Sequence, residues 1–185
     1  MMKIIRKTLG ENPMIRLAEE KDLSYVSEIY EELHTAEENG LATIGWIRGI
    51  YPTEKTAETA FRNGELFIEE DNGKIVGAAI INRNQVDVYS DGDWIHDAPD
   101  DEVMVLHTLV ISPSAAGRGF GRRFVEYYET YALENGCRYL RMDTNARNTR
   151  ARTMYRKLGY REAGIVPTTF NGIEGVQLVL LEKML

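Results

Sequence analysis

The stretch from Ser114 to Arg123, SAAGRGFGRR, places glycines at three alternate positions, 117, 119 and 121. It follows an apolar run typical of a buried strand, VMVLHTLVI, and precedes an apolar-periodic run typical of a helix. Glycine lets backbone N–H groups converge without a Cβ in the way, and a helix start adds about half a positive charge. The arginines can add charge-assisted hydrogen bonds. Such a strand–loop–helix unit suits a phosphate, and best a pyrophosphate; the alternative is a purely structural turn.

The charge distribution supports an anion site at this place. The 185-residue chain carries a net charge of −7, which argues against a nucleic-acid-binding protein. Residues 117–161 nevertheless hold 11 of the 22 Lys and Arg against four acids, so this segment carries +7. A basic segment in an acidic chain predicts a local polyanion site. The alternative is that these arginines decorate solvated helix faces.

Length and composition limit the classes of protein to which the chain can belong. The chain is long enough for one domain with a core. No run of 18 uncharged apolar residues occurs, so we expect no membrane association, and the first 13 residues lack the apolar centre of a secretion signal. The single cysteine, Cys137, cannot form an internal disulfide; we favour a structural role over a reactive thiol. These features predict a cytoplasmic protein.

Hydrophobic periodicity predicts the order of the elements. A strand at 14–17 precedes a helix ended by Asn39-Gly40, and Thr53 is the expected N-cap of a second helix. The later predictions are a hairpin across 71–74, a strand at 103–111, a helix after the glycine loop, the strand YLRMD, a helix capped by Asn148, and two closing strands. The strand–helix–strand unit from 103 to 143 requires a parallel pair with a right-handed crossover. The expected class is therefore α/β (α+β) with a mixed sheet and helices on its faces.

The spacing of the glycines distinguishes between phosphate-binding loops. No G-x-x-x-x-G-K-[ST] occurs, and the Rossmann pattern G-x-G-x-x-G fails because glycine stands at 121 instead of 122. The loop resembles the acetyl-CoA loop of the GNAT acetyltransferase superfamily, whose pattern is Gln or Arg, two residues, Gly, any residue, Gly or Ala. Ala116 departs from that pattern at its first position, which weakens one contact and leaves the main-chain cradle intact.

A second segment strengthens this resemblance. NTRARTMYRKLGY, residues 148–160, is similar to the family's N-x-x-A-x-x-x-Y-x-x-x-G-[FY] segment at every specified position, one strand after the glycine loop. The resemblance covers about Met14 to Glu182. It implies a mostly antiparallel sheet of about six to seven strands, with a splayed parallel pair at the cofactor site. Residues 13–185 are then one domain, and residues 1–12 are an N-terminal extension to which we assign no role.

The resemblance also implies where acetyl-CoA would bind. Acetyl-CoA is the expected cosubstrate, and we expect no metal. Its pyrophosphate would lie on the backbone from Gly117 to Arg122, and its pantetheine arm would pair with the strand near Leu109, whose N–H would polarise the thioester carbonyl. The implied cofactor-binding residues are Leu109, Val110, Ile111, Gly117, Arg118, Gly119, Phe120, Gly121, Arg122 and Asn148.

Two residues are candidates for acid–base catalysis. By resemblance Tyr155 is the general acid that protonates the departing thiolate, and a phenol with a pKa of about 10 can donate at neutral pH. Many family members carry a Glu where this chain has Val105. His107, on the same strand face, is similar in context (LHTLVI) to a histidine of the arylalkylamine N-acetyltransferases that helps to deprotonate the amine. Glu102 or an acid in the 87–101 loop is the alternative base.

The implied reaction is acetyl transfer from acetyl-CoA to a primary amine, a small molecule or a peptide, by direct attack in a ternary complex. We expect the acceptor site to involve the segments LATIGWIRGIYPT and 87–102, where Trp46 and Tyr51 can stack on the acceptor, and TTFNGIEG can contribute to it or to a homodimer interface. The alternatives are a non-catalytic acyl-CoA-binding or sensing domain and an unrelated nucleotide binder.

Overall fold

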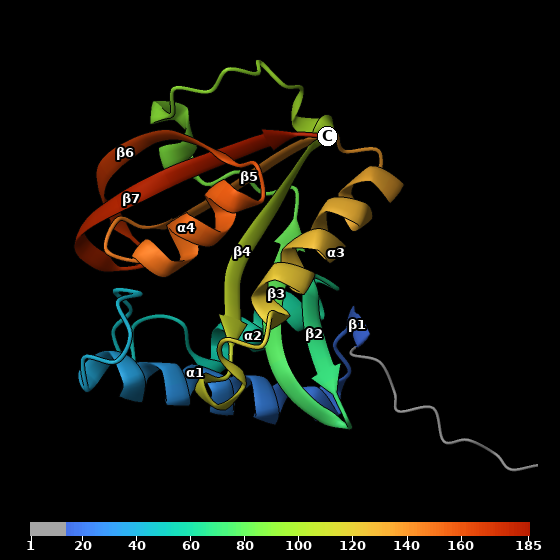
Figure 1. Cartoon of the computed structure of the whole chain (residues 1–185), viewed down its shortest axis with the longest axis vertical. Helices are drawn as coiled ribbons and strands as arrows, with labels where there is room; N and C mark the ends of the chain where they lie inside the picture. Colours follow the sequence, from blue (N-terminus) through green and yellow to red (C-terminus); the bar gives the residue numbers. More distant parts are fainter. Residues whose placement is uncertain (1–13) are drawn as a thin grey trace, which may run out of the picture.

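A computed structural model of the chain describes residues 14–185, and the proposed extension at 1–12 lies outside the described residues. The helices and strands appear in the predicted order (Figure 1). They are β1 (Met14–Leu17), α1 (Leu23–Glu38), α2 (Glu54–Arg62), β2 (Leu66–Asp71), β3 (Lys74–Asn82), β4 (Val103–Ile111), α3 (Phe120–Glu134), β5 (Tyr139–Asn145), α4 (Thr149–Lys157), β6 (Arg161–Phe170) and β7 (Ile173–Met184), with short 3-10 turns between several of them.

The seven strands form one sheet in the order β1-β2-β3-β4-β5-β7-β6. Only β4 and β5 run parallel within it; every other neighbouring pair is antiparallel. The connection between β4 and β5 passes through α3, as a parallel pair requires. This confirms the predicted mixed, mostly antiparallel sheet.

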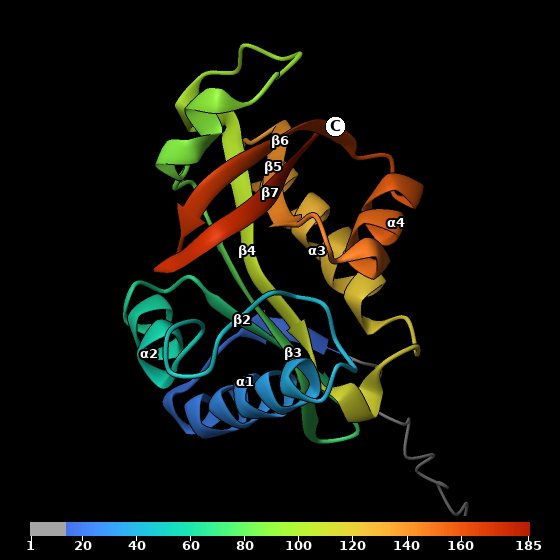
Figure 2. The ribbon, with the colours of Figure 1, turned by 90° about the vertical axis from the view of Figure 1, so that its left-hand side faces the viewer.

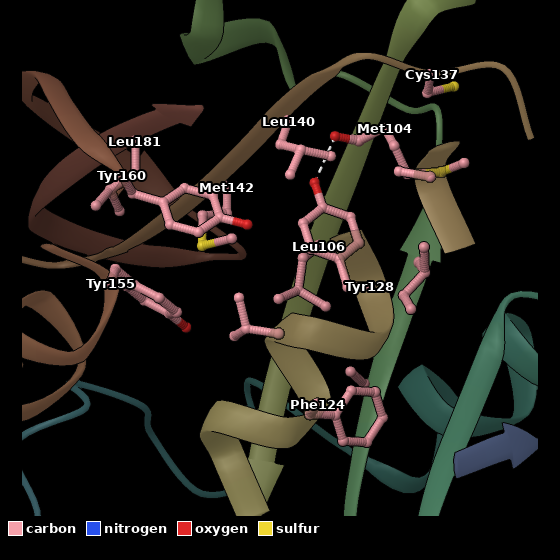
Figure 3. Packing of buried hydrophobic residues seen from close by; sticks show 14 of the residues in the cluster. Met104, Leu106, Phe124, Tyr128, Cys137, Leu140, Met142, Tyr155, Tyr160 and Leu181 are labelled. Atoms are coloured by element: carbon pink, nitrogen blue, oxygen red, sulfur yellow. Dashed lines mark hydrogen bonds between the residues drawn. The ribbon is translucent and has the colours of Figure 1, made fainter. Parts of the chain in front are cut away.

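Helices cover both faces of the sheet. Figure 2 shows α3 and α4 on one side of β4 and α1 with α2 on the other. The first layer packs Phe124, Val125 and Tyr128 against inward-facing residues of β4 and β5, and Figure 3 shows this cluster. The second layer packs Val26 and Ile29 of α1 against β2 and β3. Since successive strand residues face opposite sides, each strand contributes to both cores.

The parallel pair opens partway along its length, and this opening positions the site. Pairing of β4 with β5 ends at Leu106 and Met142, although β4 continues to Ile111 and β5 to Asn145. On the other side of β4, Thr108 and Leu109 stand opposite the single residue Ala79 of β3, which makes a β-bulge. Thr108 has a φ of 51°, a conformation that side chains with a branched Cβ rarely adopt. A bulge bends its strand, so β4 turns away from β5 where the bulge occurs.

A buried hydroxyl ties the closed part of the pair together. Tyr128 of α3 donates to the carbonyl of Met104 on β4 at 2.6 Å and approaches the carbonyl of Arg141 on β5 at 3.2 Å. Figure 3 draws the bond to Met104. The ring is fully buried, so water cannot replace the hydroxyl if it is removed.

We therefore predict that Tyr128→Phe lowers the free energy of unfolding by about 1–2 kcal/mol, the cost of leaving a buried carbonyl without its donor. Tyr127→Phe is the matched control, because Tyr127 is half-exposed on the same helix and its hydroxyl makes no hydrogen bond within residues 14–185. Urea unfolding of both variants measures the difference. Equal losses in the two variants would contradict this role for Tyr128.

Candidate active site

A cavity of about 560 Å³ lies where β4 and β5 separate. Its wall includes His107, Thr108 and Leu109 from β4, Asp143 from β5, and Tyr155 from α4. The loop between α1 and α2 closes another side with Trp46 and Tyr51, whose rings meet edge to face at 5.9 Å. The two proposed catalytic residues therefore line one cavity together with part of the proposed cofactor strand.

The glycine loop presents free backbone donors at the start of α3. Gly117 and Gly119 have φ values of 82° and 88°, which glycine adopts without strain, and a Cβ on either would meet open space. From Gly117 to Arg122 no backbone N–H donates within the described chain; the next one, Arg123, donates to the carbonyl of Gly119 at 3.1 Å. Six N–H groups at the N-terminus of a 15-residue helix are suited to bind an anion such as pyrophosphate.

The arginine side chains of this loop bind neighbouring carboxylates. Arg118 donates to Asp71 at 2.7 Å, and Arg122 donates to Glu126 at 2.7 Å. Arg123 pairs with Glu69, a carboxylate whose burial raises its pKa to about 7. Anion binding at the loop therefore depends on the backbone, and Arg118 and Arg122 reach an anion with their side chains only if these exposed ion pairs open.

The end of β4 offers a free backbone edge beside this loop. Val110 and Ile111 pair with Ala78 and Gly77 of β3 on one side, and within residues 14–185 no strand pairs with this part of β4 on its β5 side. Such an unpaired edge can bind an extended ligand as an additional strand. Leu109, Val110 and Ile111 lie on this unpaired part of β4, and their pairing with pantetheine stays a prediction.

Tyr155 projects from α4 toward the space between that helix and β4 (Figure 3). Its ring packs edge to face on Tyr160, and burial together with the nearby charge of Asp143 raises the pKa of its hydroxyl well above the ordinary value. The hydroxyl is therefore protonated at neutral pH and able to donate. Asn148 caps α4 as predicted, since its Oδ1 accepts from the backbone N–H of Ala151 at 3.2 Å, and it also lines the cavity.

A hydrogen-bond network defines the proton position on His107. Asn82 donates its amide N–H to Glu65 at 3.0 Å, while its Oδ1 accepts from the backbone N–H of Asn84. The nitrogen Nε2 of His107 lies 3.0 Å from the same Oδ1, so Nε2 carries the proton and Nδ1 is the unprotonated nitrogen. Burial lowers the pKa of His107 to about 4, and the imidazole is thus neutral at physiological pH.

Asp143 is a further residue of the cavity wall, and the sequence alone did not indicate it. Asp143 is the first residue of β5 beyond the last pair with β4, on the same sheet face as His107. Its Oδ2 accepts from the hydroxyl of Tyr89 at 2.9 Å, and burial raises its pKa to about 6. The available signal was the strand YLRMD, in which Asp143 alternates with buried apolar residues.

Two of the three segments expected at the acceptor site line the cavity, and the third does not. The loop LATIGWIRGIYPT lines the cavity, and the C-terminal segment contributes Phe170 and Asn171. The backbone N–H groups of Ile44 and Gly45 donate to Glu37, which holds the first loop against α1. No residue of 87–102 lines the cavity, so neither Glu102 nor an acid in that loop occupies the place of a base. That segment lies at the end of the molecule away from α1 and packs Tyr89 and Trp94 against the sheet (Figures 1 and 2).

The chain belongs to the acetyltransferase (GNAT) family, whose sequence profile matches residues 25–160. An uncharacterized N-acetyltransferase of Methanocaldococcus jannaschii is 30% identical over 100 residues, which are 54% of this chain and 40% of that protein. An uncharacterized N-acetyltransferase of Bacillus subtilis is 33% identical over 60 residues, 32% of this chain and 40% of that protein. The matched segments thus span less than half the length of these curated relatives.

Solved structures resemble the chain along almost its whole length. A GNAT-family acetyltransferase of Streptococcus agalactiae superposes with a TM-score of 0.77 at 24% identity, over 95% of this chain and 97% of that one. A protein of Salmonella typhimurium, provisionally named an acetyltransferase and solved with its cofactor acetyl-CoA, gives a TM-score of 0.66 at 17% identity over 94% of each chain. These likenesses show the GNAT fold.

Two features are absent from residues 14–185. No helix there is both long and apolar enough to cross a membrane. The same residues contain no group of three or more histidine, cysteine, aspartate or glutamate side chains arranged to hold a metal ion.

The raised pKa of Asp143 predicts a pH-dependent cost in stability. Because the folded state prefers the protonated carboxyl, the stability that this preference contributes is complete below the unfolded pKa of 3.8 and is lost as pH rises through about 6. We compare the free energy of unfolding of Asp143→Asn with that of the parent at each pH. We predict that the difference, variant minus parent, is about 1–2 kcal/mol larger at pH 8 than at pH 4. Urea unfolding at the two pH values measures this, with the exposed Asp91→Asn as control. A difference independent of pH would contradict the prediction.

Proposed function

We propose that the protein is an N-acetyltransferase that transfers an acetyl group from acetyl-CoA to a primary amine by direct attack. The observation that carries the proposal is the coincidence of three features at one opening of the sheet. These are the free N–H groups from Gly117 to Arg122, the unpaired edge of β4 at Leu109–Ile111, and the hydroxyl of Tyr155 at the cavity wall. The acetyl-CoA bound to the Salmonella typhimurium neighbour supports this cosubstrate.

The cavity favours direct attack over a covalent intermediate on the enzyme. The single cysteine, Cys137, is fully buried in the core beside α3 and does not line the cavity. In the proposed step the amine nitrogen attacks the thioester carbon, the carbon–sulfur bond breaks, and Tyr155 gives its proton to the departing thiolate. His107, which is neutral, takes up through Nδ1 the proton that the attacking nitrogen loses, either directly or through a bridging water.

The choice of cosubstrate is tested by thermal unfolding with acetyl-CoA, CoA, ATP and NAD in separate samples. A ligand at 100 times its dissociation constant stabilises the folded state by about 2.7 kcal/mol. For a chain of this size we expect a shift in Tm of about 5–10 °C with both CoA species and a much smaller one with ATP or NAD. Equal shifts with all four ligands would favour a general nucleotide binder, and no shift with CoA would contradict the proposed site.

The role of Tyr155 is tested by replacing it with phenylalanine. We predict that Tyr155→Phe lowers kcat by about 100-fold or more while leaving the affinity for CoA within about twofold, because only the departing thiolate requires the proton. Tyr160→Phe is the matched control, since it removes a hydroxyl from the adjacent ring, which does not line the cavity. Release of free CoA thiol and the mass of the acetylated amine measure turnover.

A parallel loss of kcat and CoA affinity in Tyr155→Phe would show a structural role for the hydroxyl instead. CoA binding with no transfer to any amine in the parent protein would favour the non-catalytic acyl-CoA-binding alternative.

A further inference from the structure

Asp143 is a carboxylate at the wall of the cavity, and no cationic side chain of residues 14–185 forms an ion pair with it. In the described chain its side chain makes one hydrogen bond, through Oδ2 to the hydroxyl of Tyr89. Arg141, two residues earlier on the same strand face, directs its guanidinium to the backbone carbonyl of His96 at 3.1 Å and over the ring of Trp94. A partly buried carboxylate costs free energy unless a cation or further donors compensate it. The fold does not supply that compensation, so a ligand can.

The titratable groups around Asp143 come from four elements. Tyr89 lies in the segment before β4, Tyr51 in the α1–α2 loop, Tyr155 on α4, and His107 on β4. Burial, together with the nearby charge of Asp143, raises the pKa of the hydroxyls of Tyr51 and Tyr155, so both phenols are protonated and uncharged at neutral pH. With His107 also neutral, the negative charge of Asp143 dominates this part of the cavity.

Two further charged side chains line the cavity, and both lie toward α2. Lys55 is on the exposed part of that helix, and Glu65, just after it, accepts from Asn82. Among residues 14–185 no arginine lines this cavity, and Arg147 of the adjoining hollow pairs with Glu37 at 3.5 Å, so a second carboxylate on a ligand would lie near Asp143 without a guanidinium to bind it.

The cavity wall also carries aromatic and aliphatic side chains. Trp46 and Tyr51 meet edge to face, and Phe170, Ile173 and Leu178 line the same cavity, together with polar residues such as Thr144 and Asn145. The hydroxyl of Tyr51 is held by a hydrogen bond to the hydroxyl of Thr108, which fixes the ring at the bulge of β4. Such a wall suits an apolar or aromatic group attached to a cationic head.

We propose that Asp143 binds the ammonium group of the acceptor, and that the acceptor is a small primary amine with an apolar or aromatic body and no carboxylate of its own. This inference rests on the proposed function for the identity of the reaction, but the binding role of Asp143 is independent of turnover. Asp143 and Tyr155 line the same cavity, and the charge of Asp143 acts on the Tyr155 hydroxyl, so an ammonium held by Asp143 is near the proposed general acid and loses a proton before its nitrogen attacks.

The proposal predicts which of two related amines the protein binds more tightly. Phenethylamine and phenylalanine share the same ring and amine, and they differ only by the α-carboxylate. In the presence of saturating CoA, which forms a complex unable to react, phenethylamine binds at least about tenfold more tightly than phenylalanine, because a second carboxylate is repelled by Asp143. Isothermal titration calorimetry at pH 8 measures both affinities.

Substitution and pH separate the role of Asp143 from that of the wall. Asp143→Asn keeps an oxygen that can accept from Tyr89 and removes the charge, so it weakens phenethylamine binding by about 30-fold or more. Glu28→Gln, an exposed carboxyl-to-amide change on α1, leaves the affinity unchanged. In the parent protein the affinity rises by about tenfold from pH 5 to pH 8, as Asp143 ionises through its pKa of about 6 and the amine stays protonated. In Asp143→Asn this rise disappears.

The outcomes distinguish this inference from the proposed function. Asp143-dependent binding of phenethylamine supports the inference whether or not acetyl transfer is detected. If Asp143→Asn retains both the affinity and its rise with pH while the CoA-induced shift in Tm is normal, the inference is overturned and an N-acetyltransferase with another ammonium site remains. Tighter binding of phenylalanine than of phenethylamine would also overturn it.

Discussion

The interruption of backbone pairing between β4 and β5 is the constraint on which the site depends. A parallel pair inside a sheet would ordinarily continue for the length of both strands, but here it ends at Leu106 and Met142 because the bulge at Thr108 bends β4 away. The separation exposes strand edges inside the molecule, and one cavity there is lined by residues of β4, β5, α4 and the α1–α2 loop, while the start of α3 lies beyond the end of β4. Where the two strands are still paired, the buried hydroxyl of Tyr128 contacts a backbone carbonyl of each strand and so holds them together.

The same opening explains why several groups are held in unfavourable states. Asp143 is a carboxyl whose burial raises its pKa, His107 an imidazole whose burial lowers its pKa, and Thr108 a residue with positive φ. Each of these reduces the stability of the folded chain, and all three lie at the cavity wall. Such a concentration of perturbed groups at one concave site is typical of ligand-binding and catalytic sites.

Much of the fold could be predicted from the sequence because local signals and the family pattern agreed. The glycine pattern at 117–121, the cap at Asn148 and the alternation of apolar residues all have direct local causes, and the structure contains the corresponding elements. The pairing of Arg118 with Asp71 and of Arg123 with Glu69 could not be predicted, because both carboxylates come from β2, far away in the sequence. Asp143 was missed for a similar reason: its importance depends on where β4 and β5 stop pairing, a tertiary feature with no local signal. The acidic segment 87–102 was expected at the acceptor site from its charge alone, and it packs at another place.

The most direct test of the account is hydrogen exchange of backbone amides with and without CoA. We expect CoA to slow exchange at two separated segments, the free N–H groups of residues 117–122 and the unpaired part of β4 at 109–111, and to leave the exchange of α1 amides unchanged. Protection of both segments would show that one ligand occupies the loop and the opened strand edge together. Protection of neither, or of the glycine loop without β4, would contradict the claim that the opening of the sheet is the cosubstrate site.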